Sequence, residues 1–264
     1  HLESALRADP RFAKAHSALA RACLARYEET GEAGWADRGR DAAQEALRLD
    51  PRDAEVRWAL ALILAGRGRR PEALDELKQA LALRPRSDDA RRLYSQMLAA
   101  DGQAEAALEQ ARQAVALRPG YAENHMTLGW AHYSAGRFHE AATAYRRVTE
   151  LLPDYAWGFQ MIGASLMMQG DLEGAVAPYR EAIRLAPDAR AWANLGYVYY
   201  AQRRLPDAVR AYEEAARLEP ASGTIRRSLG DARGKAGDAP GARADWRAAV
   251  DLSRAALKVN RRDP

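Results

Sequence analysis

The sequence predicts an all-α protein built from about seven consecutive pairs of antiparallel helices. Three observations lead to this fold class. Helix-forming residues dominate the composition, one proline recurs about every 34 residues, and small residues return at fixed places between these prolines. A unit that repeats with a single period indicates elements stacked in a row rather than one mixed core.

The composition favours helices over strands. Of the 264 residues, 48% are hydrophobic and only 8% are aromatic, and 19 glycines and 12 prolines separate stretches rich in Ala, Leu, Arg and Glu. These four residue types have high helix propensity, whereas the β-branched types that strands prefer are scarce. We therefore expect helices joined by short turns.

One proline recurs at a nearly constant interval. The spacings between its successive copies are 34, 34, 34, 34 and 33 residues. The copies are Pro51, Pro85, Pro119, Pro153, Pro187 and Pro220. An earlier proline, Pro10, lies 41 residues before Pro51, which is one period plus seven. The first copy therefore carries an insertion, for which Tyr27 to Trp35 is the expected site, either as a protruding loop or as a longer helix.

Small residues recur between these prolines. Early in each copy a large residue precedes a small one, as in Leu19-Ala20, Leu60-Ala61, Tyr94-Ser95, Leu128-Gly129, Ile162-Gly163, Leu195-Gly196 and Leu229-Gly230. A glycine follows near the middle of most copies, at Gly68, Gly102, Gly136, Gly170 and Gly237. Alanine then stands twelve residues before the proline, at Ala73, Ala107, Ala141, Ala175 and Ala208.

Each recurring residue has a structural role. Small side chains in two helices let their backbones approach closely. The central glycine supplies the left-handed residue that ends the first helix. Pro71, Pro206 and Pro240 stand where the second helix begins, a place where a missing N–H has little effect. Each copy is therefore expected to be an antiparallel helical hairpin.

The combined pattern resembles the tetratricopeptide repeat, a helical hairpin of 34 residues. The fullest copy reads Trp192-Ala-Asn-Leu195-Gly196-Tyr-Val-Tyr199 and continues with Ala208, Tyr212, Ala215 and Pro220. The resemblance covers essentially the whole chain and implies a right-handed superhelical solenoid. It divides residues 1–264 into a single array: 1–12 as the second helix of a truncated repeat, 13–53 as an enlarged repeat, 54–87, 88–121, 122–155, 156–188 and 189–222 as repeats, and 223–264 as a last repeat with an extended C-terminal helix.

The period also predicts the individual helices. First helices are expected over 13–26, 53–66, 87–100, 121–134, 155–168, 189–201 and 222–235. Their partners are expected over 36–49, 70–83, 103–117, 137–150, 171–184, 205–217 and 239–259. Arg203 replaces the turn glycine of the sixth hairpin, at a modest steric cost. Residues 1–8 and 259–263 look like parts of further copies, so we expect the array to continue beyond both ends.

Two segments resemble the C-terminal repeat arrays of bacterial serine/threonine protein kinases more specifically. They are Tyr27-Glu-Glu-Thr-Gly-Glu-Ala-Gly-Trp35-Ala-Asp and Arg254-Ala-Ala-Leu-Lys-Val-Asn-Arg-Arg-Asp-Pro264. In such proteins the array stands beside the kinase domain as an interaction or sensing segment, which is the setting that the resemblance implies. None of the motifs of the kinase itself occurs in these residues.

No sequence pattern indicates catalysis, so we expect no enzyme activity, no catalytic residue, no metal ion and no cofactor. His139-Glu140-Ala-Ala-Thr143 lacks the second histidine of a zinc-protease helix. His125 and His132 occupy packing positions of the repeat and are expected in the core. The single cysteine, Cys23, excludes an internal disulfide and reads as a small core residue.

Charge and hydropathy limit the other partner classes. The formal net charge is only +4, from 40 basic and 36 acidic residues, and the two signs alternate along the chain, whereas nucleic-acid binders cluster basic residues. We therefore expect no nucleic-acid partner, although the locally basic stretch from Arg243 to Arg262 keeps that alternative open. The longest apolar run, Trp58 to Ala65, is far too short to span a bilayer, so no direct membrane insertion is expected.

The resemblance also implies where a partner binds. In this family the second, fifth, sixth, ninth and twelfth positions of the first helices line a concave groove. The candidate groove residues are Arg92, Gln96, Met126, Trp130, Tyr133, Trp157, Gln160, Met161, Arg190, Asn194, Tyr197 and Tyr200, and further such positions hold Trp58, Met167, Arg227 and Asp231. Aromatic and Met side chains are common anchors at binding surfaces. The alternative for each of them is packing against the neighbouring hairpin.

The leading interpretation is thus a non-catalytic scaffold that binds a protein or peptide in its groove, as the sensor or docking region of a larger bacterial signalling protein. A structural module that associates with itself through its ends or its groove is the alternative from another functional class.

Overall fold

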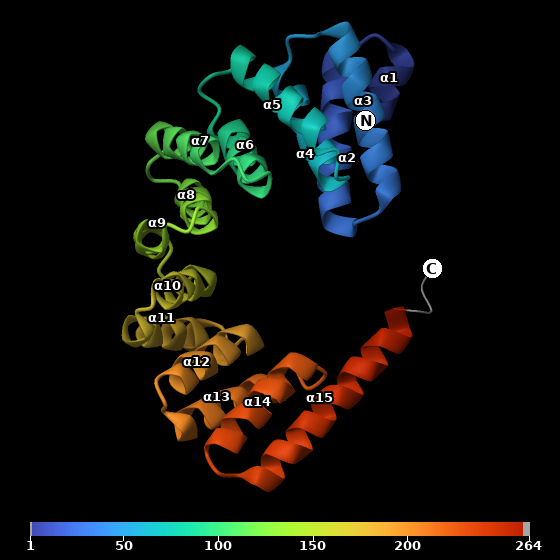
Figure 1. Ribbon diagram of the computed structural model, residues 1–264. Coiled ribbons are helices and arrows are strands. Elements are labelled where there is room, and N and C mark those ends of the chain that lie inside the picture. Colours follow the sequence, from blue (N-terminus) through green and yellow to red (C-terminus); the bar gives the residue numbers. More distant parts are fainter. Residues whose placement is uncertain (1, 261–264) are drawn as a thin grey trace. The chain divides into compact units, whose positions relative to one another are not determined.

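The computed structural model describes residues 2–260, which form fifteen α-helices and contain no strand. These helices fall into two compact units, His1–Ala135 and Gly136–Pro264. Figure 1 shows how neighbouring helices follow one another within each unit.

The first unit holds eight helices. They are α1 (Leu2–Ala8), α2 (Ala13–Thr30), α3 (Ala33–Leu49), α4 (Ala54–Gly66), α5 (Arg70–Leu83), α6 (Asp88–Ala100), α7 (Ala104–Leu117) and α8 (Ala122–Ser134). Helices α2 and α3, α4 and α5, and α6 and α7 form three hairpins. α1 packs on α2, and α8 packs on α6 and α7.

The second unit holds seven helices. They are α9 (Phe138–Leu151), α10 (Ala156–Gln169), α11 (Leu172–Leu185), α12 (Ala189–Ala201), α13 (Leu205–Leu218), α14 (Gly223–Lys235) and α15 (Ala239–Asn260). α10 and α11, α12 and α13, and α14 and α15 form hairpins, and α9 packs against α10. The expected likeness of residues 259–263 to an earlier copy falls mostly outside the described residues.

The helix bounds confirm the predicted period. All helices from α4 to α15 begin and end within one residue of the predicted ranges. The insertion does not form a loop, because both helices of the first hairpin are longer than predicted and meet at Gly31 and Glu32. The seven extra residues therefore extend the first hairpin at its turn.

Left-handed residues end the first helices as expected. Gly68, Gly102, Gly136, Gly170 and Gly237 have φ angles between 73° and 91°. Among the described residues, Arg203 is the only residue other than glycine with a positive φ, at 63°. The turn between α12 and α13 thus keeps the geometry of the other turns although its residue carries a Cβ atom.

Helix starts are fixed by side chains that accept backbone N–H groups. The Asp53 carboxylate accepts from two N–H groups of α4, those of Glu55 and Val56. α6, α11, α12 and α14 begin with similar caps from Ser87, Asp171, Asp188 and Ser222. Each such bond satisfies one of the donors that a helix leaves unpaired at its N-terminus.

Within a hairpin, the eighth residue of the first helix faces a residue of the second helix, and their sizes are complementary. A Cβ added to Gly196 would lie 3.0 Å from the ring of Tyr212, so the ring rests directly on the backbone of α12. Gly163 and Tyr179, and Gly230 and Trp246, repeat this arrangement. The Tyr212 side chain is only 5% exposed, and this burial raises the pKa of its hydroxyl to about 12.

In the second hairpin, Ala61 and Leu77 occupy the same two places, and both are buried in one hydrophobic cluster. A larger residue in the first helix is thus accompanied by a smaller one in the second. The pair sets how closely the two helices approach.

This pairing leads to a first prediction. Gly196→Ala is expected to lower the free energy of unfolding by about 1–3 kcal/mol, because the new methyl group overlaps the Tyr212 ring. In a Tyr212→Leu background the same change is expected to be neutral or stabilising, because Leu leaves room, as in the Ala61 and Leu77 pair, and Ala has the higher helix propensity. Urea unfolding of the four proteins measures both effects. An equal loss in both backgrounds would contradict the size-complementarity account.

Candidate functional site

All twelve predicted groove residues lie on first helices, and each remains at least partly exposed. Arg92 and Gln96 belong to α6, Met126, Trp130 and Tyr133 to α8, Trp157, Gln160 and Met161 to α10, and Arg190, Asn194, Tyr197 and Tyr200 to α12. The structure differentiates among them, because some take part in contacts within the fold and others do not.

The most open group lies on α12. Arg190, Asn194 and Tyr197 follow at intervals of four and three residues, so they share one face of the helix. The Tyr197 side chain is 52% exposed, a high value for a large aromatic residue. None of the three side chains has a hydrogen bond or ion pair within residues 2–260. This stripe presents a guanidinium, an amide and a phenol to solvent.

The α10 residues are partly used by the fold. The Trp157 ring meets the Tyr145 ring edge-on with a centroid distance of 5.6 Å. The centroid of the Tyr155 ring lies 6.0 Å from that of Trp157. Gln160 donates from Nε2 to the Asp188 carboxylate at 3.4 Å. Because Asp188 caps α12, Gln160 links α10 to the start of the next first helix. These two side chains position the surface as well as contributing to it.

On α8 the two aromatic groove residues support each other. The rings of Trp130 and Tyr133 stack with a centroid distance of 6.1 Å and an interplanar angle of 9°. Trp130 is 44% exposed. Stacked rings keep a fixed orientation and lose little conformational entropy on contact with a partner. α8 therefore offers a flat and rigid apolar surface.

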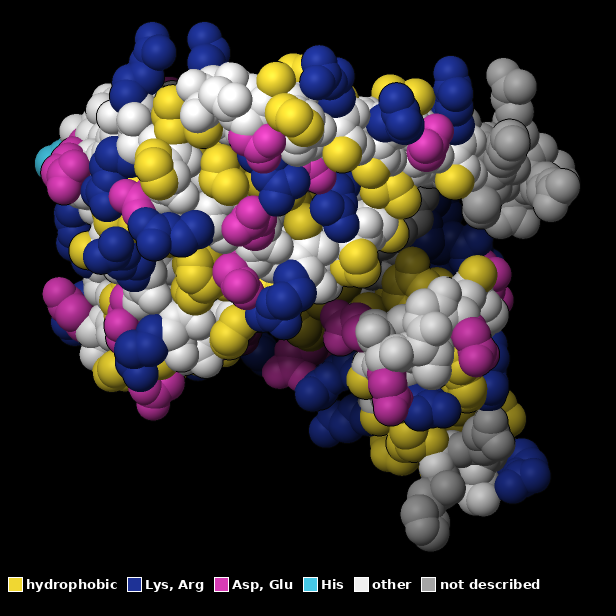
Figure 2. Space-filling model, turned by 90° about the horizontal axis from the view of Figure 1, so that it is seen from below, with side chains coloured by type: hydrophobic (Ala, Val, Ile, Leu, Met, Phe, Trp, Pro, Cys, Tyr) yellow, Lys and Arg dark blue, Asp and Glu magenta, His cyan; other side chains and the backbone are white. Residues whose placement is uncertain are grey.

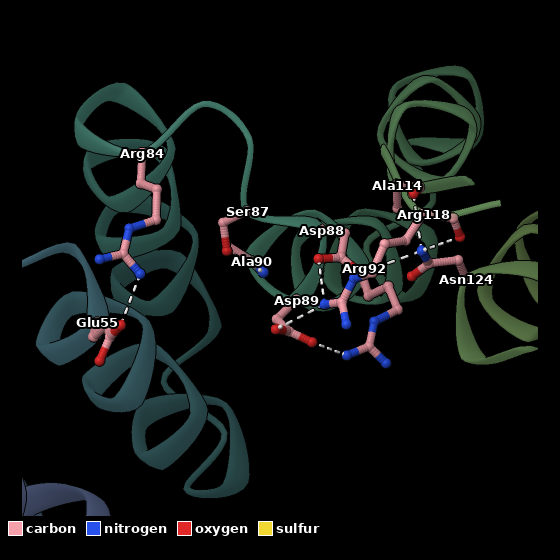
Figure 3. Close-up of polar contacts among 10 residues, drawn as sticks. All are labelled: Glu55, Arg84, Ser87, Asp88, Asp89, Ala90, Arg92, Ala114, Arg118 and Asn124. Carbon is pink, nitrogen blue, oxygen red and sulfur yellow. Dashed lines mark hydrogen bonds and ion pairs between the residues drawn. The ribbon is translucent and has the colours of Figure 1, made fainter. Parts of the chain in front are cut away.

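Arg92 on α6 is held in place by a polar network, shown in Figure 3. It pairs with Asp89 and lies over the Tyr121 ring at 5.0 Å from the centroid. Arg118 lies over the same ring at 4.6 Å and pairs with Asp88 at 2.5 Å and with Asp89 at 3.5 Å. The Arg92 guanidinium is thus fixed in orientation, and its charge is balanced by that of Asp89.

The buried end of this network is Asp88. Its carboxylate is almost inaccessible and accepts hydrogen bonds from Arg118 and from the Asn124 amide, the latter at 3.2 Å. Asn124 also donates to the carbonyl oxygens of Ala114 and Arg118. Burial alone would raise the pKa of Asp88, but the bonds from Arg118 and Asn124 outweigh it and hold the pKa below its ordinary value.

Sequence reasoning missed Asp88, Arg118 and Asn124. They stand 30 and 36 residues apart, close to one repeat length, so the period does bring their segments together. Hydropathy, however, assigns Asp and Asn to solvent. The only available signal was a charged residue at a place where other first helices carry Ala or Gly.

A pocket of about 240 Å³ opens beside Trp58 in the first unit. Its wall includes Arg21 from α2, Glu55 from α4 and Asp89 from α6, so three successive first helices contribute. Glu55 accepts from Arg21 at 3.1 Å and from Arg84 at 2.7 Å. The Arg84 contact and the capping Ser87 appear in Figure 3. The predicted groove positions of these hairpins therefore meet around a tryptophan framed by ion-paired groups.

No metal-binding cluster of His, Cys, Asp or Glu occurs among the described residues. His125 and His132 are buried, as predicted, and His125 bonds through Nε2 to the Pro119 carbonyl oxygen at 2.8 Å. Cys23 is also buried, as expected. Of the helices described, none combines the length and the apolar character needed to cross a membrane.

On the face shown in Figure 2, basic and acidic side chains are interspersed with hydrophobic ones. Many of the arginines pair with a carboxylate three residues away on the same helix, as Arg48 does with Glu45 and Arg184 with Glu181. Such pairs leave little charge uncompensated on the surface.

The sequence matches a family model described as tetratricopeptide repeat over five segments. The matched residues are 31–88, 64–122, 126–190, 161–224 and 193–256. Together these segments cover most of the chain. None of the curated proteins matches the sequence.

Several solved structures share the arrangement of helices. MamA from Desulfovibrio magneticus RS-1 is 24% identical, with a TM-score of 0.59 over 64% of this chain and 96% of that chain. YrrB, described as a TPR protein with an unusual peptide-binding site, is 21% identical, with a TM-score of 0.59 over 77% of this chain and 98% of that one. The Cut9–Hcn1 structure of the APC/C covers 96% of this chain and 49% of that chain at 17% identity and a TM-score of 0.66. At these identities the likeness concerns the fold.

The Asp88 network leads to a second prediction. Asp88→Asn is expected to lower the free energy of unfolding by about 1–2 kcal/mol near pH 7, because it removes the charge that accepts one buried and one partly buried hydrogen bond. The folded pKa of Asp88 lies below its unfolded value, so this contribution is complete above the unfolded pKa of about 3.9 and is lost as pH falls through the folded pKa. Urea unfolding at pH 7 and at acidic pH compares the two proteins.

The matched control for this prediction is Asp75→Asn, because the Asp75 side chain is 72% exposed and pairs weakly with Lys78. Its effect is expected to stay within about 0.5 kcal/mol at every pH. A loss from Asp88→Asn that remained constant down to the acid limit would argue against a charge-dependent network.

Proposed function

The chain belongs to the tetratricopeptide repeat family, and from that premise we propose that it is a non-catalytic scaffold that binds a peptide or protein segment on its first-helix faces. One observation carries the proposal: the stripe of Arg190, Asn194 and Tyr197 on α12 is exposed and has no partner within the described chain. A 52% exposed tyrosine beside unpaired polar groups is expected where another molecule supplies the contacts.

The chemistry of the stripe suits an extended peptide. The Asn194 amide has both donors and an acceptor, so it can bond with the N–H and C=O groups of one peptide unit. The Arg190 guanidinium provides a fork for a carboxylate. Tyr197 adds a rigid apolar ring with a polar tip, a combination common at binding surfaces. A short segment with an acidic residue near an apolar one matches these three groups.

The first unit offers a second set of contacts with similar chemistry. Trp130 presents a stacked, half-exposed ring, and the pocket beside Trp58 has room for one apolar side chain among ion-paired groups. That YrrB is described as having a peptide-binding site supports the general role, since it shares the fold. These surfaces are proposed to act as contact points for protein partners.

We further propose a signalling setting, in which the array is the docking or sensing region of a larger bacterial protein. Its support is the likeness of the segments around Trp35 and after Arg254 to arrays that accompany serine/threonine kinases. In the structure, Trp35 lies between Arg26 and Arg38, whose guanidinium groups are 5.7 and 5.0 Å from its ring. Pull-down of the full-length product from its native cells, followed by a phosphorylation assay, tests this setting.

A third prediction tests the binding role. A peptide-library screen against the chain is expected to return ligands that bind at least about tenfold more weakly to a Trp130→Ala, Tyr197→Ala double variant, because this variant loses an exposed aromatic anchor from the first-helix face of each unit. Fluorescence anisotropy measures the dissociation constants. Phe12→Ala removes an exposed aromatic ring outside the first-helix faces and is expected to leave binding unchanged. Unaltered binding by the double variant would place the site elsewhere.

Self-assembly is the second candidate function, and one observation favours it. Trp246 and Val250 on α15 are 41% and 48% exposed, and they border a hollow of about 400 Å³ together with Gly223 and Arg227. A contiguous apolar surface of this kind is typical of a contact between copies.

A fourth prediction separates this function from partner binding. If the α15 surface joins copies, the weight-average mass measured by light scattering rises with concentration, and Val250→Glu lowers it toward the monomer value because it places a charge in the contact. A constant monomer mass at high concentration would exclude self-assembly and leave the scaffold proposal intact.

A further inference from the structure

A second cavity lies on the opposite side of α12 from the stripe of Arg190, Asn194 and Tyr197. It has a volume of about 450 Å³ and is bordered by α11, α12 and α13. From α12 its lining includes Trp192, Leu195 and Tyr199. At 100° per residue, these side chains point about half a turn away from the stripe. The cavity is therefore separate from the first-helix face.

The hairpin of α12 and α13 lacks a polar pair that three other hairpins have. In those three the fourth residue of the first helix is an arginine that bonds to the residue nineteen positions later. Arg57 bonds to Glu76 at 2.7 Å, Arg91 to Gln110 at 2.7 Å, and Arg226 to Asp245 at 3.3 Å. In the hairpin of α12 and α13 these places hold Trp192 and Ala211. No polar pair therefore bridges the two helices here, and both residues line the cavity.

The floor of the cavity is apolar and well packed. Leu195 and Ala211 are each 2% exposed, and the Tyr199 ring is 4% exposed. Trp192 and Ile183 complete the apolar lining. Such a floor accepts one apolar side chain but has nothing to hold a polar group in place.

The rim is basic. Arg180, Arg184 and Arg210 border the cavity, and Asp207 is the one acidic residue among its lining residues. Arg184 is paired with Glu181, and Asp207 is shared by Arg210 and Arg204. Asp154 and Glu173 also interact electrostatically with Arg184 and Arg204, so carboxylates balance the charges of Arg184, Arg204 and Arg210.

Arg180 is the rim arginine whose charge no carboxylate balances among the described residues. Its Nε donates to the Tyr199 hydroxyl oxygen at 3.0 Å, and within residues 2–260 it has no carboxylate partner. Its two terminal nitrogens form no hydrogen bond there either. They are available as a fork for a carboxylate from another molecule.

We propose that this cavity is a second protein-docking site, which takes an acidic segment of a partner in which one apolar side chain is flanked by Asp or Glu residues. The apolar side chain fills the space over Ala211, and the flanking carboxylates pair with Arg180 and with the other rim arginines. Charge complementarity selects this partner, because a neutral apolar segment would leave the charge of Arg180 without a carboxylate.

Fluorescence anisotropy with a defined probe tests the site in the complete chain. The probe is a fluorescein-labelled peptide with one leucine flanked on each side by two glutamates, and its comparison peptide has glutamine in place of every glutamate. The glutamate peptide is expected to bind at least about tenfold more tightly at low ionic strength, because each charge-assisted pair adds to the affinity. Equal binding of both peptides would overturn the proposal.

Two variants locate the contact. Trp192→Arg with Ala211→Glu introduces the pair found in three other hairpins, so the fold and the net charge are expected to be kept while the cavity is filled. Arg180→Gln with Arg184→Gln lowers the rim charge instead. Both are expected to weaken binding by about tenfold or more, whereas Arg243→Gln, which removes an exposed arginine of α15, is expected to leave it unchanged.

The test of this cavity can be distinguished from the test of the proposed binding site on the first-helix face. Tyr197→Ala is expected to leave binding of the glutamate peptide unchanged, so that loss of one site does not imply loss of the other. Undiminished binding by the variant with the filled cavity would overturn the assignment. So would displacement of the probe by inorganic phosphate at low concentration, because it would identify an anion site rather than a docking site for a peptide.

Discussion

The close approach of two helices at one small residue is the constraint on which this structure depends. In the second unit an aromatic ring of each second helix rests on a glycine of the first helix, as Tyr212 does on Gly196. The contact fixes both the distance and the rotation of the two helices, because a flat ring has one favourable way to lie against a bare backbone. The exposed side chains of the first helix therefore have a defined orientation relative to the second helix.

This geometry explains how α12 serves two surfaces. The side of the helix that meets α13 is committed to packing through Leu195, Gly196 and Tyr199. The opposite stripe is free of that packing, and at the edge next to α11 Trp192 lines a cavity in place of the arginine found in three other first helices. A single helix of thirteen residues thus separates a polar and aromatic stripe from a basic hollow. The residues shared by all repeats determine how the helices pack, whereas residues particular to one hairpin determine what its surfaces can bind.

The same distinction decides how much the sequence could reveal. The period predicted helix bounds to within one residue from α4 onward, and it predicted the left-handed turns, because these depend on small residues and prolines within one copy. It also placed the groove candidates on first helices. Which of these candidate side chains form contacts within the fold could not be predicted in this way. Whether Gln160 reaches Asp188, or Arg92 is held by Asp89, depends on side-chain rotamers between neighbouring copies.

Interactions between copies were the least predictable part. Asp88 and Asn124 are polar residues buried against each other, and no hydropathy pattern assigns such residues to an interior. The basic cavity in the second unit is defined by a missing pair, which becomes visible only when the equivalent places of several hairpins are compared in three dimensions. The sequence was sufficient to predict the helix period, whereas the structure was needed to find the polar contacts between neighbouring repeats.

The long first hairpin has a consequence for how the chain assembles. Copies with similar patterns can associate with the wrong neighbour during folding, a known failure of repeat proteins. α2 has 18 residues, whereas the other first helices described have 13 or 14. Its additional turn brings the Tyr27 ring against Gly66, with the hydroxyl 3.4 Å from the Gly66 carbonyl oxygen. Since no other first helix described is long enough to make this contact, it forms only when the first hairpin stacks correctly on the second, which distinguishes this pair of neighbours from the others.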